Sequence, residues 1–384
     1  MKNVIKQILR EGLITEERIK FSMNVPEDIV QIKDVFKANN FVLYLVGGCV
    51  RDAILNIQPK DYDLVTDANP DKVEELMKGA GYKTLPTGKS FGVINVFTDK
   101  GEYEIATMRE DVGKGRRPDS VVFSDINTDS QRRDLTSNAL YYDIDKFEII
   151  DLVGGVNDVK NGIVRTVGDP QNRFEEDRLR ILRVCRFAGR FGSELDPATD
   201  AALQKDASLD GISGERIRDE FIKGIKSAKS VKHFLELINK YGLFKWIFPD
   251  LNINLKFIEN TDPIIVIASL LKDNSLDSLG KKLNSLKYKD DEAKAIRFLI
   301  GLLNLSVNTA VVLKRAQQHS TVTPEQIKDF GRYEHIDSKL LTAFLSFNLS
   351  VSGEELMART GIKAGPELGK EIQRLETDNF KKLL

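Results

Sequence analysis

Two aspartates, Asp61 and Asp63, are separated by one tyrosine and followed by the apolar residues Leu64 and Val65. If this segment is a strand, side chains alternate between its faces, so both carboxylates project to one side, with Cβ atoms roughly 7 Å apart. Two like charges on one face repel each other unless cations neutralise them. The spacing therefore favours a catalytic metal site with Asp61 and Asp63 as ligands and Mg²⁺ as the ion, because Mg²⁺ prefers oxygen ligands.

A phosphate-binding turn is predicted shortly before the acidic pair. An apolar run that begins at residue 43 leads directly into Gly47 and Gly48, and a helical pattern with Arg51 in its first turn follows. Glycines at a strand-to-helix turn let backbone N–H groups approach an anion, and arginine can bind a phosphate through two hydrogen bonds. Such a turn followed by paired acids predicts a site for a metal-bound nucleoside triphosphate. Two ions about 3.5–4 Å apart could activate an attacking hydroxyl and hold the leaving pyrophosphate.

A third acidic residue would complete this site. Glu104, in the strand-like segment EYEIATMR, is the candidate, and Glu102 lies on the same face of that strand. Taken alone, an Asp-x-Asp pair is usually a solvated strand end, and a Gly-Gly pair is usually only a turn. Their order and spacing together favour the catalytic interpretation.

A series of charged residues in FEEDRLRILRVCRF could recognise a base rather than bind a metal ion. Asp177, Arg180, Arg183 and Arg186 recur every three residues, which keeps neighbours close together on a helix. In a generic helix, an Asp177–Arg180 pair would be a surface ion pair that contributes little to stability. Beside a triphosphate site, the same pair could select a base, because aspartate accepts hydrogen bonds and the arginine fork donates them. Such a pair suits the pairing edges of cytosine and adenine and mismatches those of guanine and uracil.

The candidate residues fall in two regions of different structure. Short β-type runs and intervening helical stretches predict a mixed sheet domain between about residues 41 and 150. From about residue 169 to the C-terminus, apolar residues recur at helical spacing. We therefore predict an α+β fold, in which an N-terminal sheet domain is followed by an all-α half and residues 1–40 form a peripheral helical extension. The Gly-, Lys- and Arg-rich segment 111–120 is the best candidate for a mobile loop.

Composition limits the class of protein. The chain has 384 residues, which implies two or more domains, and its formal net charge of −1 means that nucleic-acid contacts depend on local patches. Cys49 and Cys185 form no CxxC pair, which favours a reducing compartment and argues against structural zinc. No apolar run reaches membrane-spanning length, and the N-terminus lacks the apolar core of a secretory signal. We expect a cytoplasmic protein with no membrane partner, and the sequence indicates no particular oligomeric state.

Three motifs carry a resemblance to a known family. LVGGCVRD followed by DYDLVT resembles the first signature of the DNA polymerase β-type nucleotidyltransferases. RRDLTSNAL (132–140) resembles their next signature, and RFEEDRLRILRVCRF (173–187) resembles their EDxxR signature. Together, from Leu43 to about Lys223, the motifs are similar to those of the bacterial-type, class II tRNA nucleotidyltransferases, the CCA-adding enzymes, and of the related bacterial poly(A) polymerases.

The resemblance implies an activity and a domain plan. The expected activity is template-independent addition of C, C and A to the 3′ end of tRNA lacking its CCA end, with CTP and ATP as substrates and release of pyrophosphate. The implied plan is a catalytic head at 41–168, a helical nucleotide-selecting neck at 169–245, and a helical tRNA-binding body and tail at 246–384.

The resemblance also implies roles for individual residues. Asp177 and Arg180 would act as an amino-acid template for the incoming base, and Arg183 and Arg186 would hold the base and phosphates. Arg133 would contact the nucleotide. Asp134 would sense the ribose hydroxyl.

Two further segments favour CCA addition over poly(A) addition. DVGKGRRPDSVVF resembles the flexible loop of the CCA-type enzymes, with Asp111, Arg116 and Arg117 as its charged residues. GIKAGPELG (361–369) resembles a turn in their tail, although Ala364 stands where proline is common. There Lys363 and the N–H groups of a turn entering a helix could hold an RNA phosphate.

Other functions stay open at this point. A poly(A) polymerase and a partial enzyme that adds only C or only A share the catalytic half. A non-catalytic RNA-binding relative is disfavoured by the intact Asp61 and Asp63. A fused phosphohydrolase is disfavoured because no histidine–aspartate pair of the HD type is visible.

Overall fold

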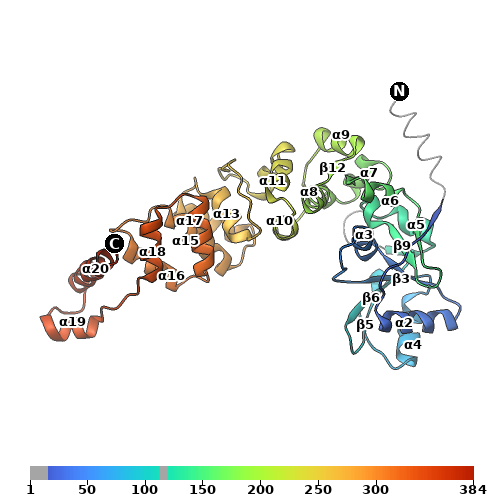
Figure 1. Cartoon of the computed structure of the whole chain (residues 1–384), viewed down its shortest axis with the longest axis horizontal. Helices are drawn as coiled ribbons and strands as arrows, with labels where there is room; N and C mark the ends of the chain where they lie inside the picture. The colour runs from blue at the N-terminus through green and yellow to red at the C-terminus, as the bar shows by residue number, and fades with distance from the viewer. Residues whose placement is uncertain (1–15, 113–119) are drawn as a thin grey trace. The chain divides into compact units, whose positions relative to one another are not determined.

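The computed structural model describes residues 16–112 and 120–384 (Figure 1). It divides into two compact units, Met1–Gly211 and Ile212–Leu384. Within the described residues, all the strands lie in the first unit and the second unit is helical. The predicted α+β fold, a sheet domain followed by a helical half, is confirmed.

Eight strands form the central sheet of the first unit, in the order β1-β10-β9-β2-β3-β6-β5-β4. Neighbouring strands run antiparallel except β3 and β6, which are parallel. The strands are β1 (Glu17–Lys20), β2 (Leu43–Val46), β3 (Asp63–Thr66), β4 (Lys83–Gly88), β5 (Val93–Phe97), β6 (Glu102–Thr107), β9 (Leu140–Asp143) and β10 (Glu148–Asp151). Two smaller pairs are antiparallel β7 (Arg109–Val112) with β8 (Ser120–Phe123), and parallel β11 (Ile163–Val164) with β12 (Glu194–Leu195).

The sheet has an apolar core on each face because its strands alternate. Leu64 of β3 belongs to the larger core and its neighbour Val65 to the smaller one. Helices α2 (Glu27–Ala38), α3 (Gly48–Ile54), α4 (Pro70–Gly79) and α6 (Gly155–Lys160) contribute buried residues to the larger core. The smaller core includes Tyr141 and Met108, with Ile126 of α5 (Ile126–Gln131) packed against it. Asp63 and Glu104 flank Leu64 and Ile105 in sequence, so they project to the smaller-core face.

The described part of the predicted N-terminal extension is an integral part of the sheet domain. Glu17–Lys20 form edge strand β1, which pairs with β10, and α2 buries Ile29, Ile32 and Phe36 completely. The prediction of helix holds for α2, but Glu17–Lys20 form a strand, and neither segment is peripheral. The reason is that the short, charged ERIK segment has the composition of a protected sheet edge, while its partner strand lies far along the sequence.

The first unit also includes residues predicted to start a separate neck. Helices α7 (Pro170–Glu176), α8 (Leu179–Phe191) and α9 (Pro197–Lys205) precede its end at Gly211. The predicted boundary at residue 168 therefore does not coincide with a division between compact units.

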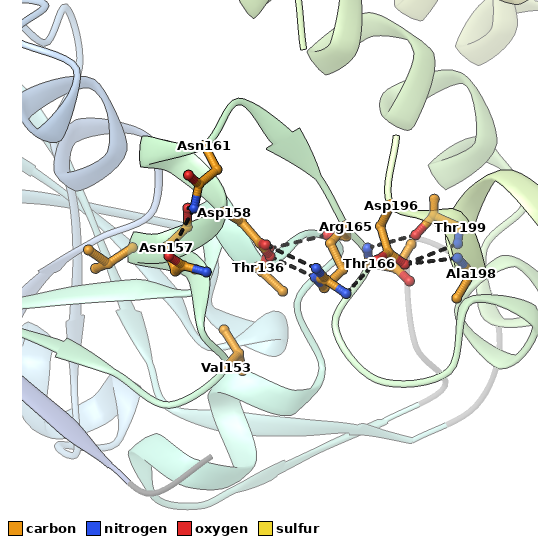
Figure 2. Close-up of polar contacts among 12 residues, drawn as sticks. Thr136, Val153, Asn157, Asp158, Asn161, Arg165, Thr166, Asp196, Ala198 and Thr199 are labelled. Atoms are coloured by element: carbon orange, nitrogen blue, oxygen red, sulfur yellow. Dashed lines mark hydrogen bonds and ion pairs between the residues drawn. The ribbon is translucent and has the colours of Figure 1, made fainter. Parts of the chain in front are cut away.

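A buried ion network crosses that predicted boundary. Arg165 Nε donates to Asp158 Oδ2 at 2.9 Å, and Nη1 donates to Asp196 Oδ1 at 2.5 Å. Figure 2 shows Arg165 between these two aspartates, with Thr136 bonded to Asp158 on one side and Thr199 bonded to Asp196 on the other. The network joins the segment after the RRD motif to the start of α9.

The second unit is a succession of helices. Ser213 accepts a hydrogen bond from the Arg216 amide as the N-cap of α10, and Ile217, Phe221 and Ile225 are buried along that helix. None of the described helices in the chain is both long enough and apolar enough to span a membrane. The helices are α10 (Gly214–Ser227), α11 (Val231–Lys240), α12 (Phe244–Ile247), α13 (Pro263–Leu271), α14 (Leu276–Ser285), α15 (Asp290–Leu302), α16 (Ala310–Gln318), α17 (Pro324–Tyr333), α18 (Ser338–Ser346), α19 (Gly353–Thr360) and α20 (Pro366–Lys381).

Candidate active site

The two aspartates lie at the start of β3. Asp63 is its first residue, whereas Asp61 precedes the strand, and both residues are exposed. The pKa of the Asp63 carboxyl is raised, first because surrounding protein displaces water, and also because Asp61 is negatively charged; the charge of Arg133 opposes the rise. Asp61 therefore lies close enough to Asp63 to repel it. A divalent cation would relieve this repulsion.

Glu104 lies next to this pair on the parallel neighbouring strand. Leu64 of β3 is in register with Ile105 of β6, so Asp63 and Glu104 come one residue before that matched pair. The pKa of Glu104 is raised by desolvation and by the charges of Asp63 and Glu102. Within residues 16–112 and 120–384, no group of three or more His, Cys, Asp or Glu side chains is arranged to hold a metal ion. Glu104 as a third metal ligand thus stays a prediction.

The Gly-Gly turn follows β2 as predicted. Gly47 has φ +76°, a left-handed conformation that favours glycine, and its amide donates to the Leu140 carbonyl at 2.9 Å. A Cβ atom at Gly47 would lie 3.4 Å from the Asn138 carbonyl oxygen and 3.8 Å from Arg133 Nη1. The turn is therefore closely packed against the RRD segment.

Arg51 is buried below the turn rather than open to solvent. Its guanidinium donates from Nε to Asp52 Oδ1 at 2.9 Å and from Nη1 to the Asn138 side chain, and it lies over the rings of Phe187 and Phe191. Burial lowers the pKa of Arg51, and the charge of Asp52 opposes this. In this arrangement Arg51 links α3 to η2 (Thr136–Asn138) and α8, so direct phosphate binding by Arg51 would require contacts to be exchanged.

The RRD segment places Arg133 beside the acidic pair. Arg133 Nε and Nη2 donate to Asp129 Oδ2 at 3.1 and 2.9 Å, and Nη1 donates to the Asn138 carbonyl at 3.4 Å. Arg133 acts electrostatically on Asp63, as the opposing contribution to that pKa shows. The arginine charge therefore lies near both the Gly47 turn and Asp63.

Asp134, the third residue of the motif, faces α8. It accepts from Arg183 Nε at 2.6 Å and from Asn138 Nδ2 at 3.2 Å. Burial alone would raise the pKa of Asp134, but the charge of Arg183 and these hydrogen bonds hold it down at about 2. Asp134 is therefore ionised at neutral pH.

The EDxxR segment spans the end of α7, a short break, and the start of α8. Asp177 is the C-cap of α7, with extended backbone, and accepts from the Leu179 amide at 3.1 Å. Arg180 lies in the first turn of α8, forms an ion pair with Glu176 at 2.5 Å, and donates to the Arg132 carbonyl at 3.0 Å. The sequence predicted Asp177 and Arg180 on one helix, whereas Asp177 lies just before it.

The remaining arginines of α8 surround an aromatic side chain. Arg183 and Arg186 lie 5.7 and 4.2 Å from the ring centroid of Phe187, which is itself stacked with Phe191. Arg190 donates to Asp52, the partner of Arg51. One side of α8 therefore carries a cluster of positive charge against the head.

Two residues of this region were not identified from the sequence. Asn138 bonds Arg51, Arg133 and Asp134, and Asp129 binds both arginines of the RRD motif. Asp129 precedes Arg132 by three residues and Arg133 by four, which is the spacing of neighbours on a helix and could have revealed it.

Two further segments were predicted to contribute to function, the charged loop and the turn in the tail. Of the loop residues, Asp111 lies in β7, with its backbone in register with Val121, while Arg116 and Arg117 lie outside the described residues. In the tail, the predicted turn does enter a helix, since Pro366 is the first residue of α20, and Lys363 is exposed.

Known proteins are similar to this chain in both sequence and fold. Residues 43–165 match the family model described as the poly A polymerase head domain, and residues 192–254 match that of a probable RNA- and SrmB-binding site of polymerase A. The CCA-adding enzyme of Staphylococcus saprophyticus is 35% identical over 380 residues, which cover 90% of this chain and 92% of that protein. Poly(A) polymerase I of Salmonella typhimurium is 33% identical over 256 residues, which cover 63% of this chain and 54% of that protein.

A solved structure agrees with the fold. The Bacillus stearothermophilus CCA-adding enzyme in complex with CTP matches with a TM-score of 0.70 and 23% identity, covering 94% of each chain. The match to poly(A) polymerase I stops at about half of that protein, whereas the match to the CCA-adding enzymes extends over nearly the whole chain. This protein belongs to the family of the CCA-adding enzymes, the tRNA nucleotidyltransferases.

Proposed function

We propose that the protein adds C, C and A, in that order and without a nucleic-acid template, to the 3′ end of tRNA lacking its CCA end. CTP and ATP are the substrates and pyrophosphate is released. The observation that carries the proposal is the placement of Asp61 and Asp63 beside Arg133 and the Gly47 turn, with the arginine side of α8 bonded to the same RRD segment.

The donor set fits Mg²⁺. Asp61 and Asp63 offer carboxylate oxygens. The pKa of Asp63 and of Glu104 is raised first by desolvation and then by neighbouring negative charges, an environment that a bound divalent cation would stabilise. With two protein ligands, the remaining positions would be filled by triphosphate oxygens and water, as is common for Mg²⁺. When bound, the ion would stabilise negative charge on the phosphates and lower the pKa of the attacking hydroxyl.

The residues of the chain would position the reactants. The Gly47 turn lets the triphosphate approach the backbone, and Arg133 supplies a fixed positive charge beside it. Asp134, held ionised by Arg183, is an acceptor for a ribose hydroxyl. These contacts would orient the α-phosphate for attack by the 3′ end of the RNA, which is the main contribution a protein makes to phosphoryl transfer.

Base selection is proposed for Asp177 and Arg180. Asp177 accepts and Arg180 donates, so together they match the pairing edges of cytosine and adenine. Arg180 would exchange its contacts with Glu176 and the Arg132 carbonyl for the base.

The second unit is proposed to bind the body of the tRNA. Lys223, Lys226, Lys229 and Lys232 are exposed on and between α10 and α11 and could face RNA phosphates. Lys363, at the Gly/Pro turn before α20, could bind a phosphate in the same way. A tRNA substrate also supports our expectation of a cytoplasmic protein.

One assay separates the proposed function from the alternatives. Labelled tRNA lacking CCA is incubated with Mg²⁺ and with CTP, ATP or both, and product lengths are resolved on a gel. Full CCA addition gives two added residues with CTP and three with both nucleotides. Long products with ATP alone would identify a poly(A) polymerase, arrest after C or CC a partial enzyme, and no product a non-catalytic relative.

A further inference from the structure

Asp129, in α5, lies outside every motif considered above. Its side chain is completely buried, and a buried carboxylate is costly unless it is fully paired. Burial alone would raise the pKa of Asp129, but the two arginines and a tyrosine hold it down at about 2. Its partners are Arg132 Nε at 2.8 Å, Arg133 Nη2 at 2.9 Å, the Tyr141 hydroxyl at 2.7 Å and the Arg109 amide at 3.3 Å.

Arg133 is held from several directions by this carboxylate and its neighbours. Nε and Nη2 both donate to Asp129, Nε also donates to the Tyr141 hydroxyl at 3.1 Å, and the guanidinium lies 5.2 Å from the Tyr141 ring centroid. Tyr141 is itself fully buried on β9, a central strand of the sheet. The arginine is therefore fixed to the most rigid part of the first unit.

The remaining end of the guanidinium points to the catalytic groups. Nη1 donates to the Asn138 carbonyl and lies beside Gly47, and the charge of Arg133 reaches Asp63. A triphosphate that extends from the Gly47 turn to the aspartates would lie close to Arg133 Nη1. An arginine already held in place loses less conformational freedom when the phosphate binds.

We infer that Asp129 is a positioning residue, which fixes Arg133 so that its charge meets the triphosphate between Gly47 and Asp63. The role rests on the proposed function, because it concerns how the same site holds its nucleotide. Asp129 does not touch the substrate and acts only through Arg133. It should therefore affect the phosphates, which CTP and ATP share, and leave the choice of base unchanged.

The test uses inorganic tripolyphosphate with Mg²⁺, a probe that has the phosphates without a base. Binding is measured by calorimetry on the full chain. Asp129→Asn keeps the shape of the side chain and removes its charge, so we expect the affinity for tripolyphosphate, CTP and ATP to fall by the same factor, roughly tenfold. The ratio of CTP to ATP affinity should not change.

A matched control separates positioning from general stability. Asp151 is also a buried carboxylate of this unit, and it accepts from the amides of Val153, Gly155 and Val156 rather than from an arginine of the site. Asp151→Asn should lower thermal stability but leave tripolyphosphate binding as in the wild type. In an Arg133→Gln background, Asp129→Asn should have no further effect on binding, because the residue it positions is gone.

Three outcomes would overturn the inference. They are unchanged tripolyphosphate affinity in Asp129→Asn, an equal loss in Asp151→Asn, and an undiminished effect of Asp129→Asn in the Arg133→Gln background. If Asp129→Asn does not fold, Tyr141→Phe provides the test instead. This variant removes the hydrogen bond of the Tyr141 hydroxyl to Asp129 and the one that it accepts from Arg133. We expect a smaller loss in the same direction, and wild-type affinity would refute the role. If the wild type adds no nucleotide to tRNA, the proposed function fails while tripolyphosphate binding still reports on Asp129.

Discussion

Arg183 of α8 reaches back 49 residues along the sequence to bond Asp134 of the RRD segment, with 2.6 Å between Nε and Oδ2. This ion pair holds a helix proposed to select the base against the segment proposed to hold the ribose. Because the carboxyl of Asp134 is largely buried and its pKa is about 2, the pair also makes stability depend on pH.

The first prediction concerns that pH dependence. The folded pKa of Asp134 is below the unfolded value of about 3.9, so its contribution to stability is present above pH 4 and is lost as pH falls toward 2. Asp134→Asn should lower the free energy of unfolding by about 2 kcal/mol at pH 7 and by progressively less below pH 4. Urea titrations at pH 7, 5, 4 and 3 measure this. A difference between wild type and variant that stays constant over this range would contradict the coupling.

The second prediction concerns the acidic pair. Asp61→Ala or Asp63→Ala should reduce addition of both C and A by at least roughly a hundredfold, because a metal ion contributes several kcal/mol to such a transition state. Single-turnover rates at saturating Mg²⁺ are the measurement. Glu102, which bonds Asn95, provides a control, and Glu102→Gln should remain active. Near-normal turnover in either aspartate variant would exclude its role as a ligand.

The third prediction concerns base choice. Asp177→Ala should lower use of CTP and ATP and relax rejection of UTP and GTP, since a lost base-edge contact costs on the order of 1–3 kcal/mol. Relative kcat/KM for the four nucleotides is the readout, and Arg180→Ala should behave alike. Glu176→Gln is informative because it weakens the ion pairs of Glu176 with Arg180 and Arg173 while Asp177 and Arg180 themselves stay unchanged. Unchanged nucleotide preference in both Asp177 and Arg180 variants would leave them with a purely structural role.

The fourth prediction concerns residues 111–117, most of which lie outside the described residues. Under the proposed function the same site accepts C twice and then A, so we expect Asp177 and Arg180 to be reoriented between the two bases. We expect that a neutral Gly/Ser linker in place of 111–117 leaves addition of two C residues mostly intact and stalls the final A. A time course on tRNA lacking CCA, with both nucleotides present, should accumulate the CC product. Equal loss of both additions would show that the segment is only structural.

The fifth prediction concerns the Arg165 network. Arg165→Met leaves Asp158 and Asp196 buried without their shared cation, which should cost about 3–5 kcal/mol. Thermal or urea unfolding measures this loss. Arg165→Met combined with Asp158→Asn should recover part of the stability, because one uncompensated charge is removed. A single variant as stable as the wild type would show that the two carboxylates are solvated.

Elements with a strong local pattern could be predicted from the sequence. The strands at Asp63–Thr66 and Val93–Phe97, and the hairpin of β9 and β10, follow runs of apolar residues bounded by turn residues. The Gly-Gly turn between strand and helix could be predicted too, because the φ of +76° at Gly47 lies in the left-handed region that favours glycine.

Contacts between distant residues could not be predicted in this way. The position of β1 depends on pairing with β10, and nothing in ERIK itself identifies that partner. The spacing of the charged residues predicted that Asp177 lies on the same helix as Arg180, Arg183 and Arg186. In the structure the backbone of Asp177 is extended, and α8 begins after it. Arg51 has the right position for a phosphate, but Asp52, Asn138 and two phenylalanines surround it, and three of these four residues lie far along the chain.

The pairing of β1 with β10 also affects how the chain folds during synthesis. Lys20, at the end of β1, bonds the Lys146 carbonyl 126 residues later. At about 5–20 residues per second, a ribosome needs roughly 6 to 25 seconds to make that intervening stretch. Until then β1 has no partner strand, so a nascent chain arrested before residue 148 should expose Glu17–Lys20 to proteases and chaperones, and this sheet edge closes only once β10 has been made.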